Sequence, residues 1–219
     1  FLGGPVQSGD TSHNTWDNGY PSGGNYWSNF NGTDFCTGVN QNLTGKDGLG
    51  DSPYFIYANN VDNYPLVGSF NEFGVDTSFG HQRILTLSNS EVRDVDFSIL
   101  NQSEAKFCFK VNQAVDSNGF CRVNIPKVLI NEPYTVKIDG EIVNDPFVRE
   151  LPFPASTFEY LYVEVPQGEH AIEIAGTTKV ALIEKEKSDE PTPTPEPNPT
   201  PSPSPSPTST PTPMPSPAP

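Results

Sequence analysis

The feature that most limits the fold of this chain is an alternation of apolar and polar side chains within residues 73–183. The clearest examples are RILTL, VDFSI, FCFKV, YTVKI and HAIEI, which are separated by residues typical of turns. A period of two gives a strand one apolar face and does not fit an amphipathic helix. Seven or eight such strands within about 110 residues are typical of an antiparallel β-sandwich. The alternation excludes a parallel α/β sheet, whose strands are apolar on both faces.

Two local features refine this prediction. The dipeptide Asp139-Gly140 between YTVKI and EIV predicts a two-residue hairpin turn. Cys108 lies on the polar face of its expected strand, whereas Cys121 lies on the apolar face of another, so we do not expect these two to pair. With Cys36 the count is odd and contains no CxxC, which indicates neither a zinc site nor a disulfide framework.

Residues 1–72 have a different character and show no helical periodicity. Gly and Asn are frequent there, and turn formers such as DNG, PSGG and KDG separate short aromatic pieces such as NYWSNF and SPYFIY. Pieces this short cannot bury a core by themselves. We therefore expect this segment to pack on a larger body, and the chain to be a piece of a longer polypeptide.

Residues 184–219 begin with the charged run EKEKSDE and continue with proline at almost every second position, which accounts for 14 of the 24 prolines. Such a tail is expected to be disordered and extended, like the glycosylated stalks of surface proteins. Three N-x-S/T sequons, at Asn31, Asn42 and Asn101, suit a secreted protein. We therefore expect an extracellular, cell-surface location and a glycoprotein; an ordinary disordered linker is the alternative.

The net charge of −15 is distributed without a basic stripe, so nucleic-acid binding is not expected. No run of about 18 apolar residues occurs that could cross a membrane. We expect contact with a membrane only through an anchor absent from this chain.

Three motifs in order, NTWDNGYPSGGNYWSNFNGTD, TGKDGLGDSPYFI and NNVDNYPLV, resemble the closing segment of NosD-like right-handed parallel β-helix proteins, which are abundant on archaeal surfaces. The resemblance covers about residues 14–67. A looser likeness, carried by GFCRVNIPKVLI, PYTVKIDG and HAIEIAGTT, links the strand-rich part to a β-sandwich that follows such helices. It implies an all-β protein: the end cap of a pectin-lyase-like β-helix in residues 1–72, a β-sandwich in 73–183 and a stalk. Upstream coils would be its main partner.

The best metal candidate is the loop LTGKDGLGDSPY, where Asp47 and Asp51 lie four residues apart around two glycines. Calcium binds several carboxylate and carbonyl oxygens on tight loops, and Asp34 or Asp62 would complete a cluster if the fold brought them near. The alternative is a set of Asx turns in which these aspartates accept backbone N–H groups. Lys46 reduces the negative charge of the loop.

Copper is not expected, although the family name is associated with it, because soft copper sites use clusters of Cys, Met or His. The only methionine is Met214, and His13, His81 and His170 are far apart in the sequence.

Four aromatic residues, Trp16, Tyr20, Tyr26 and Trp27, could stack on the sugar rings of extracellular or surface glycans. The alternative is that they close the open end of a β-helix and cover its apolar edge.

The sequence therefore predicts a non-catalytic structural or adhesive segment that presents an upstream β-helix on a stalk. The alternative is a fragment of a carbohydrate-active β-helix enzyme, a polysaccharide lyase or hydrolase, whose catalytic coils lie outside this chain. Glycoside hydrolysis requires two facing carboxylates. The candidate acids lie in the expected end cap, so we expect no catalytic residues here.

Overall fold

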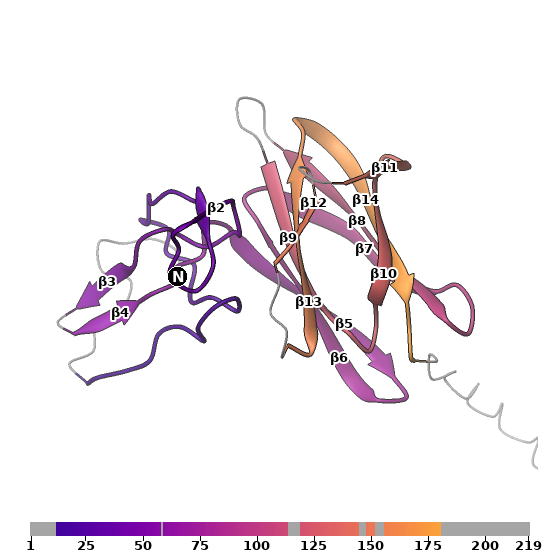
Figure 1. Cartoon of the computed structure of the whole chain (residues 1–219), viewed down its shortest axis with the longest axis horizontal. Helices are drawn as coiled ribbons and strands as arrows, with labels where there is room; N and C mark the ends of the chain where they lie inside the picture. Colours follow the sequence, from indigo (N-terminus) through magenta and orange to yellow (C-terminus); the bar gives the residue numbers. More distant parts are fainter. Residues whose placement is uncertain (1–11, 58, 114–118, 145–147, 152–155, 181–219) are drawn as a thin grey trace, which may run out of the picture. The chain divides into compact units, whose positions relative to one another are not determined.

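A computed structural model describes residues 12–57, 59–113, 119–144, 148–151 and 156–180. These residues form strands, bridges and turns but no helix, so the described part is all-β (Figure 1). It therefore contains no helix long and apolar enough to cross a membrane. The predicted stalk, residues 184–219, lies outside the described residues.

Ten of the strands form two five-stranded antiparallel sheets in a β-sandwich-like arrangement (Figure 1). The first sheet has the order β11(Glu141–Val143), β10(Asn131–Ile138), β14(Gly168–Thr177), β8(Glu104–Gln113) and β7(Glu91–Ile99). The second sheet has the order β12(Val148–Glu150), β13(Phe158–Val165), β9(Gly119–Pro126), β6(Gly80–Ser88) and β5(Ser69–Thr77). The structure therefore confirms the expected fold class, an all-β protein with antiparallel sheets in a sandwich-like arrangement.

The main core consists of alternate residues of both sheets, as the period of two predicts. It includes Phe107, Phe109 and Val111 of β8 and Cys121, Val123 and Ile125 of β9. The predicted apolar faces of these two strands are confirmed. All three cysteines are free, and Cys121 is fully buried.

The predicted hairpin turn is also confirmed. Asp139 and Gly140 have φ values of 52° and 87° and join β10 to β11, where Ile138 pairs with Glu141. Two successive positive φ values are the signature of a type I′ turn, whose twist matches that of the flanking strands.

Strand β13 differs from the simple alternation because both of its faces are buried. Leu161, Val163 and Val165 belong to the main core, whereas Tyr160 and Tyr162 lie on the opposite face and are equally buried. The face that carries Tyr160 and Tyr162 is thus not the one that packs between the sheets. The sandwich also begins earlier than residue 73, because β5 starts at Ser69.

Residues 12–68 contain two small antiparallel pairs. One pair is β1(Cys36–Thr37) with β2(Leu43–Thr44), and the other is β3(Tyr54–Tyr57) with β4(Asn60–Asp62). We call residues 12–68 the N-terminal segment. Most of its length is turns and loops, as its glycine and asparagine content predicted.

The N-terminal segment packs on the outer face of the second sheet. A separate apolar cluster, which we call the second core, joins the two parts and consists of Leu49, Leu66, Leu87, Phe120 and Tyr162. The sandwich provides a larger body on which this segment packs, as the sequence predicts. The described residues show no coil of a β-helix, so the end-cap assignment stays a proposal.

Candidate functional site

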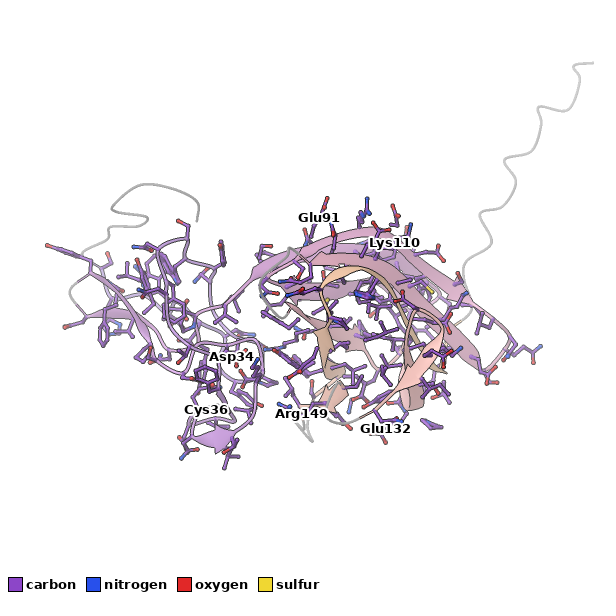
Figure 2. All side chains as sticks on the ribbon, turned by 90° about the horizontal axis from the view of Figure 1, so that it is seen from above. Asp34, Cys36, Glu91, Lys110, Glu132 and Arg149 are labelled. Atoms are coloured by element: carbon purple, nitrogen blue, oxygen red, sulfur yellow. The ribbon has the colours of Figure 1, made fainter. Side chains whose placement is uncertain are left out.

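The three predicted metal-ligating aspartates lie in neighbouring loops of the N-terminal segment, and each accepts hydrogen bonds from the protein. Asp34, which is labelled in Figure 2, accepts the backbone N–H groups of Asp47 and Gly48 at 3.0 and 2.9 Å. Its two carboxylate oxygens therefore fix the start of the KDGLGD turn. Asp34 thus accepts backbone N–H groups, as in the alternative to a metal site, but through long-range contacts and not through a local Asx turn.

Asp47 is fully buried. Its carboxylate accepts the backbone N–H of Leu49 at 3.0 Å and the side-chain amide of Gln41 at 2.8 Å. The other amide atom of Gln41, Oε1, is buried and has no hydrogen-bond partner among the described residues. Asp47 thus ties the second-core residue Leu49 to the loop that carries Gln41.

Asp51 accepts three donors from the strand-forming part of the segment. These are the hydroxyl of Thr33 at 2.9 Å, the backbone N–H of Phe35, and the backbone N–H of Cys36 at 2.8 Å. The four-residue spacing of Asp47 and Asp51 therefore directs the two carboxylates to different loops.

Burial makes this group of carboxylates electrostatically unusual. The pKa of Asp34 is raised to about 7, mainly by desolvation and in part by the nearby Asp47 carboxylate, against the lowering by backbone hydrogen bonds. Desolvation also raises the pKa of Asp47, against hydrogen bonds from Gln41 and Leu49 and the attraction of Arg122. Two close, poorly hydrated carboxyl groups resist simultaneous ionisation.

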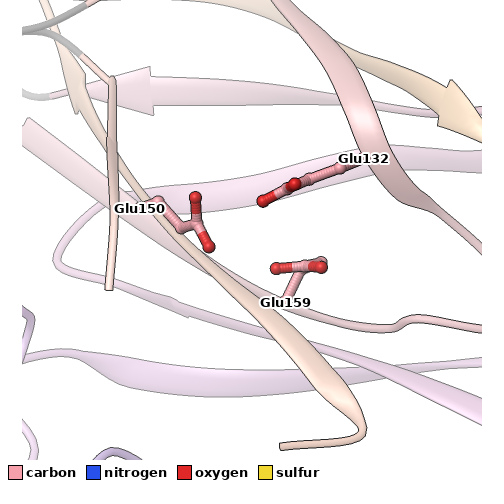
Figure 3. A group of neighbouring side chains, drawn as sticks. All are labelled: Glu132, Glu150 and Glu159. Carbon is pink, nitrogen blue, oxygen red and sulfur yellow. The ribbon is translucent and has the colours of Figure 1, made fainter. Parts of the chain in front are cut away.

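Among the described residues, one acidic group brings three ligand atoms within 4.8 Å of one another, and it is not the predicted one. It consists of Glu132, Glu150 and Glu159 from β10, β12 and β13 (Figure 3). Lys127 Nζ lies 3.4 Å from Glu159 Oε1, so the one buried member has an ion-pair partner. The protein's own lysine therefore supplies the cation at this cluster.

The calcium prediction for Asp34, Asp47 and Asp51 has a direct test. A calcium site here requires EDTA to lower the melting temperature and added calcium to restore it, because a ligand that binds only the folded state stabilises it. Differential scanning calorimetry of the same sample with EDTA, calcium and magnesium makes the measurement. An unchanged melting temperature in all three would contradict the calcium prediction and leave the Asx-turn role.

The predicted sugar-stacking residues lie in two different environments. Trp27 is 1% exposed, stacks on Tyr54 with ring centroids 4.5 Å apart, and donates its indole N–H to Asp62 at 2.8 Å. Its ring faces are therefore not available to a sugar. Trp16 is half-buried, contacts Trp27 with centroids 5.9 Å apart, and donates its indole N–H to Asn60.

Tyr20 and Tyr26 are half-buried and pack against the second core. The Tyr20 hydroxyl lies 3.3 Å from that of Thr37, and its ring contacts that of Tyr64. The geometry of the four aromatic residues therefore fits the alternative of covering apolar surface. Sugar binding by Trp16, Tyr20 and Tyr26 stays a prediction.

The sequence suggests Asp62 only as an additional metal ligand, and the structure gives it a different role. It is fully buried, and it accepts the backbone N–H of Asn25 at 2.7 Å as well as the indole of Trp27. Its other oxygen accepts the backbone N–H of Tyr64 at 3.1 Å. One carboxylate thus connects residues 25–27 with residues 62–64 in a segment that has little regular structure.

The most informative residue at this site, Arg122 on β9, was not identified from the sequence. It is 1% exposed and donates to the backbone carbonyls of Asp47, at 2.9 Å, and Pro21. It also donates to Asn124 at 3.1 Å, and its guanidinium carbon lies 5.2 Å from the ring centroid of Tyr160. Burial lowers the pKa of this guanidinium from its ordinary value.

A second arginine makes a similar contact from the edge of the same sheet. Arg149 on β12 donates to the backbone carbonyl of Lys46 at 3.3 Å and lies over the ring of Tyr162, 6.0 Å from its centroid. The KDGLGD turn is therefore held from the sandwich side by Arg122 and Arg149 and from its own side by Asp34.

The remaining candidates are separate from this network. His81 and His170 lie 2.7 Å from Asp76 and Asp139, respectively, in different parts of the sandwich. The sequon residues Asn31, Asn42 and Asn101 are all exposed, as a glycosylation acceptor must be, and their modification stays a prediction.

No protein-family model matches the chain, and no curated protein or solved structure is significantly similar to it. The function therefore has to be argued from the contacts described above.

Proposed function

We propose that this chain is a non-catalytic structural segment of an extracellular cell-surface protein of the NosD-like type found in archaea. In this proposal the N-terminal segment closes the upstream β-helix coils. The sandwich holds that segment firmly and connects it to the Pro-rich stalk. The chain would then carry mechanical load between a presented domain and the cell surface.

The observation that carries this proposal is the buried contact between the N-terminal segment and the second sheet. It combines the apolar second core with an arginine that donates to two backbone carbonyls of the segment. Backbone contacts of this kind fix the path of a loop, because they do not depend on flexible side chains at the far end. We therefore expect the N-terminal segment and the sandwich to unfold as one unit under force.

The chemistry of the acidic residues supports a structural role. The carboxylates of Asp34, Asp47, Asp51 and Asp62 each accept two or more hydrogen bonds from the protein. A general acid or base needs a carboxyl group that can reach a substrate. These four groups are instead used to hold loops. Adhesion to glycans and the alternative of a carbohydrate-active enzyme fragment both depend on groups other than these.

Force spectroscopy tests the proposal directly. Pulling on residues 1–183 between marker domains should give a single unfolding step that contains both the N-terminal segment and the sandwich. Leu49→Ala removes a fully buried side chain from the second core, which typically costs about 2–5 kcal/mol. This variant should release the N-terminal segment as a separate step at lower force.

The matched control is Leu43→Ala in the same segment, because that side chain is 61% exposed. It should unfold like the wild type. A wild-type protein that loses its N-terminal segment in an early, low-force step would contradict a load-carrying joint. Release of sugar products from polysaccharides by the wild type would contradict the non-catalytic part of the proposal.

A further inference from the structure

A cavity of about 170 Å³ lies where the N-terminal segment meets the second sheet. The sandwich contributes Leu85 and Thr86 from β6 and Arg122 and Asn124 from β9, and the segment contributes Ser22 and Leu66. The cavity thus has apolar walls together with one buried cation and several neutral polar side chains. The structural role proposed above assigns nothing to this space.

Arg122 has hydrogen-bonding capacity beyond its contacts with the protein. A guanidinium has five N–H donors, and Arg122 makes one hydrogen bond from each of its three nitrogens, to Asn124, Asp47 and Pro21. Two N–H groups therefore make no hydrogen bond within the described residues. All three acceptors are neutral oxygens, because Asp47 contributes its backbone carbonyl.

Among the described residues no carboxylate oxygen lies within 4.0 Å of the Arg122 guanidinium, so its charge has no direct ion-pair partner there. The carboxylate of Asp47 attracts it only from a greater distance. A buried charge is normally paired, since its desolvation costs several kcal/mol. The Asp47 carboxylate is directed instead to Gln41 and the backbone of Leu49. A bound anion in the cavity would supply a direct ion-pair partner and acceptors for the two remaining N–H groups.

We propose that this cavity binds a small organic anion, namely a short-chain carboxylate. The carboxylate oxygens accept hydrogen bonds from Arg122, the geometry in which a guanidinium binds most strongly. The aliphatic tail lies among Leu66, Leu85 and Leu87, which line the same cavity. Because the lining comes from both the N-terminal segment and the sandwich, the bound anion strengthens the contact between them.

The experiment titrates the full chain with butyrate and, as a neutral molecule of similar shape, with 1-butanol. Butyrate should raise the melting temperature by about 3–6 °C at roughly ten times its Kd, and butanol should not. In NMR spectra butyrate should shift the Nε–Hε signal of Arg122 and the backbone amides of Ser22 and Thr86. Sodium chloride and sodium sulfate at matched ionic strength control for salt.

Variants keep the test independent of the folding role of Arg122. Leu85 is half-buried and lines the cavity, so Leu85→Phe places a larger side chain in the cavity wall. This variant should abolish both effects of butyrate. Leu100→Phe makes the same change at a position that is 51% exposed and does not line the cavity, and it should respond like the wild type. Equal effects of butyrate and butanol, equal effects of butyrate and the inorganic salts, or no effect of butyrate would each overturn the proposal.

Discussion

Replacing Arg122 with leucine is expected to lower the free energy of unfolding by about 3 kcal/mol, because it leaves buried backbone carbonyls without donors. The carbonyls of Pro21 and Asp47 both receive an N–H from this side chain. Urea-induced unfolding followed by tryptophan fluorescence measures the change, since both tryptophans lie in the N-terminal segment.

An opposing effect has to be considered, because replacing a buried ion pair by apolar residues is often neutral or stabilising. That result requires both partners to become apolar. Here the partners are backbone groups, which no substitution can remove, so the desolvation cost of two carbonyls remains after Arg122→Leu. The stacking of the guanidinium on Tyr160 is lost as well.

The control is Arg83→Leu on β6. Its side chain is 63% exposed and pairs with Glu72 at 3.3 Å, a surface contact worth about 0–1 kcal/mol. Hydrogen exchange locates the effect: Arg122→Leu should deprotect the amides of Gly23 and Leu66, whose hydrogen bonds lie within the N-terminal segment. Equal losses of stability in the two variants would show that Arg122 does not hold the segment.

The strands and turns of the sandwich could be predicted because they depend on residues that are close together in the sequence. In β8 and β9 the alternation identified the core face residue by residue, and Asp139-Gly140 identified its turn type. Arg122 could not be identified in this way. It alternates with Cys121 and Val123, which usually indicates a solvent-exposed polar face.

A signal for the buried outer face was nevertheless present. Leu85 and Leu87 on β6 and Tyr160 and Tyr162 on β13 are apolar on the same face as Arg122. Apolar residues on both faces of a strand indicate a covering layer. What covers the face could not be predicted, because the N-terminal segment has no periodicity and its contacts join residues far apart in the sequence.

The acidic site shows the same limit. The spacing of Asp47 and Asp51 is compatible with both a calcium loop and Asx turns, because both use Asp and Gly for the same backbone reasons. The contact of Asp34 with the KDGLGD turn spans 13 residues. Only the fold determines which carboxylate oxygens meet backbone N–H groups, so composition alone left the two alternatives open.

A second large effect is expected from the carboxyl group of Asp34. The free energy of unfolding should fall as the pH rises from about 4.5 to 7. The ordinary pKa of this carboxyl group is 3.8, and in the folded protein it is raised to about 7, mainly by burial. A raised carboxyl pKa stabilises the folded state below the unfolded pKa, and this contribution is lost as the pH rises toward 7. One such group gives a slope of up to about 1.4 kcal/mol per pH unit.

Other titratable groups contribute either in the same pH range as Asp34 or outside it. The pKa values of Asp47, Asp62 and Glu159 are also raised by burial, so they add to the same slope. The pKa of Asp94 is lowered by Lys110, and its contribution is therefore lost only as the pH falls below about 4. The pKa of His170 is raised above 6.5 by Asp139, which places its effect at the upper end of the range.

Asp34→Asn is expected to remove the contribution of Asp34 to this slope, since the amide does not titrate but still accepts a hydrogen bond at the KDGLGD turn. Unfolding by urea at several pH values and constant ionic strength should give a wild-type protein about 2–3 kcal/mol more stable at about pH 4.5 than at pH 7. Asp94→Asn is the matched control, because its effect falls below this range and should leave the slope unchanged. If the wild-type protein instead gained stability toward pH 7, or if Asp34→Asn kept the full slope, the Asp34 carboxyl would have to be ionised and well solvated in the folded state.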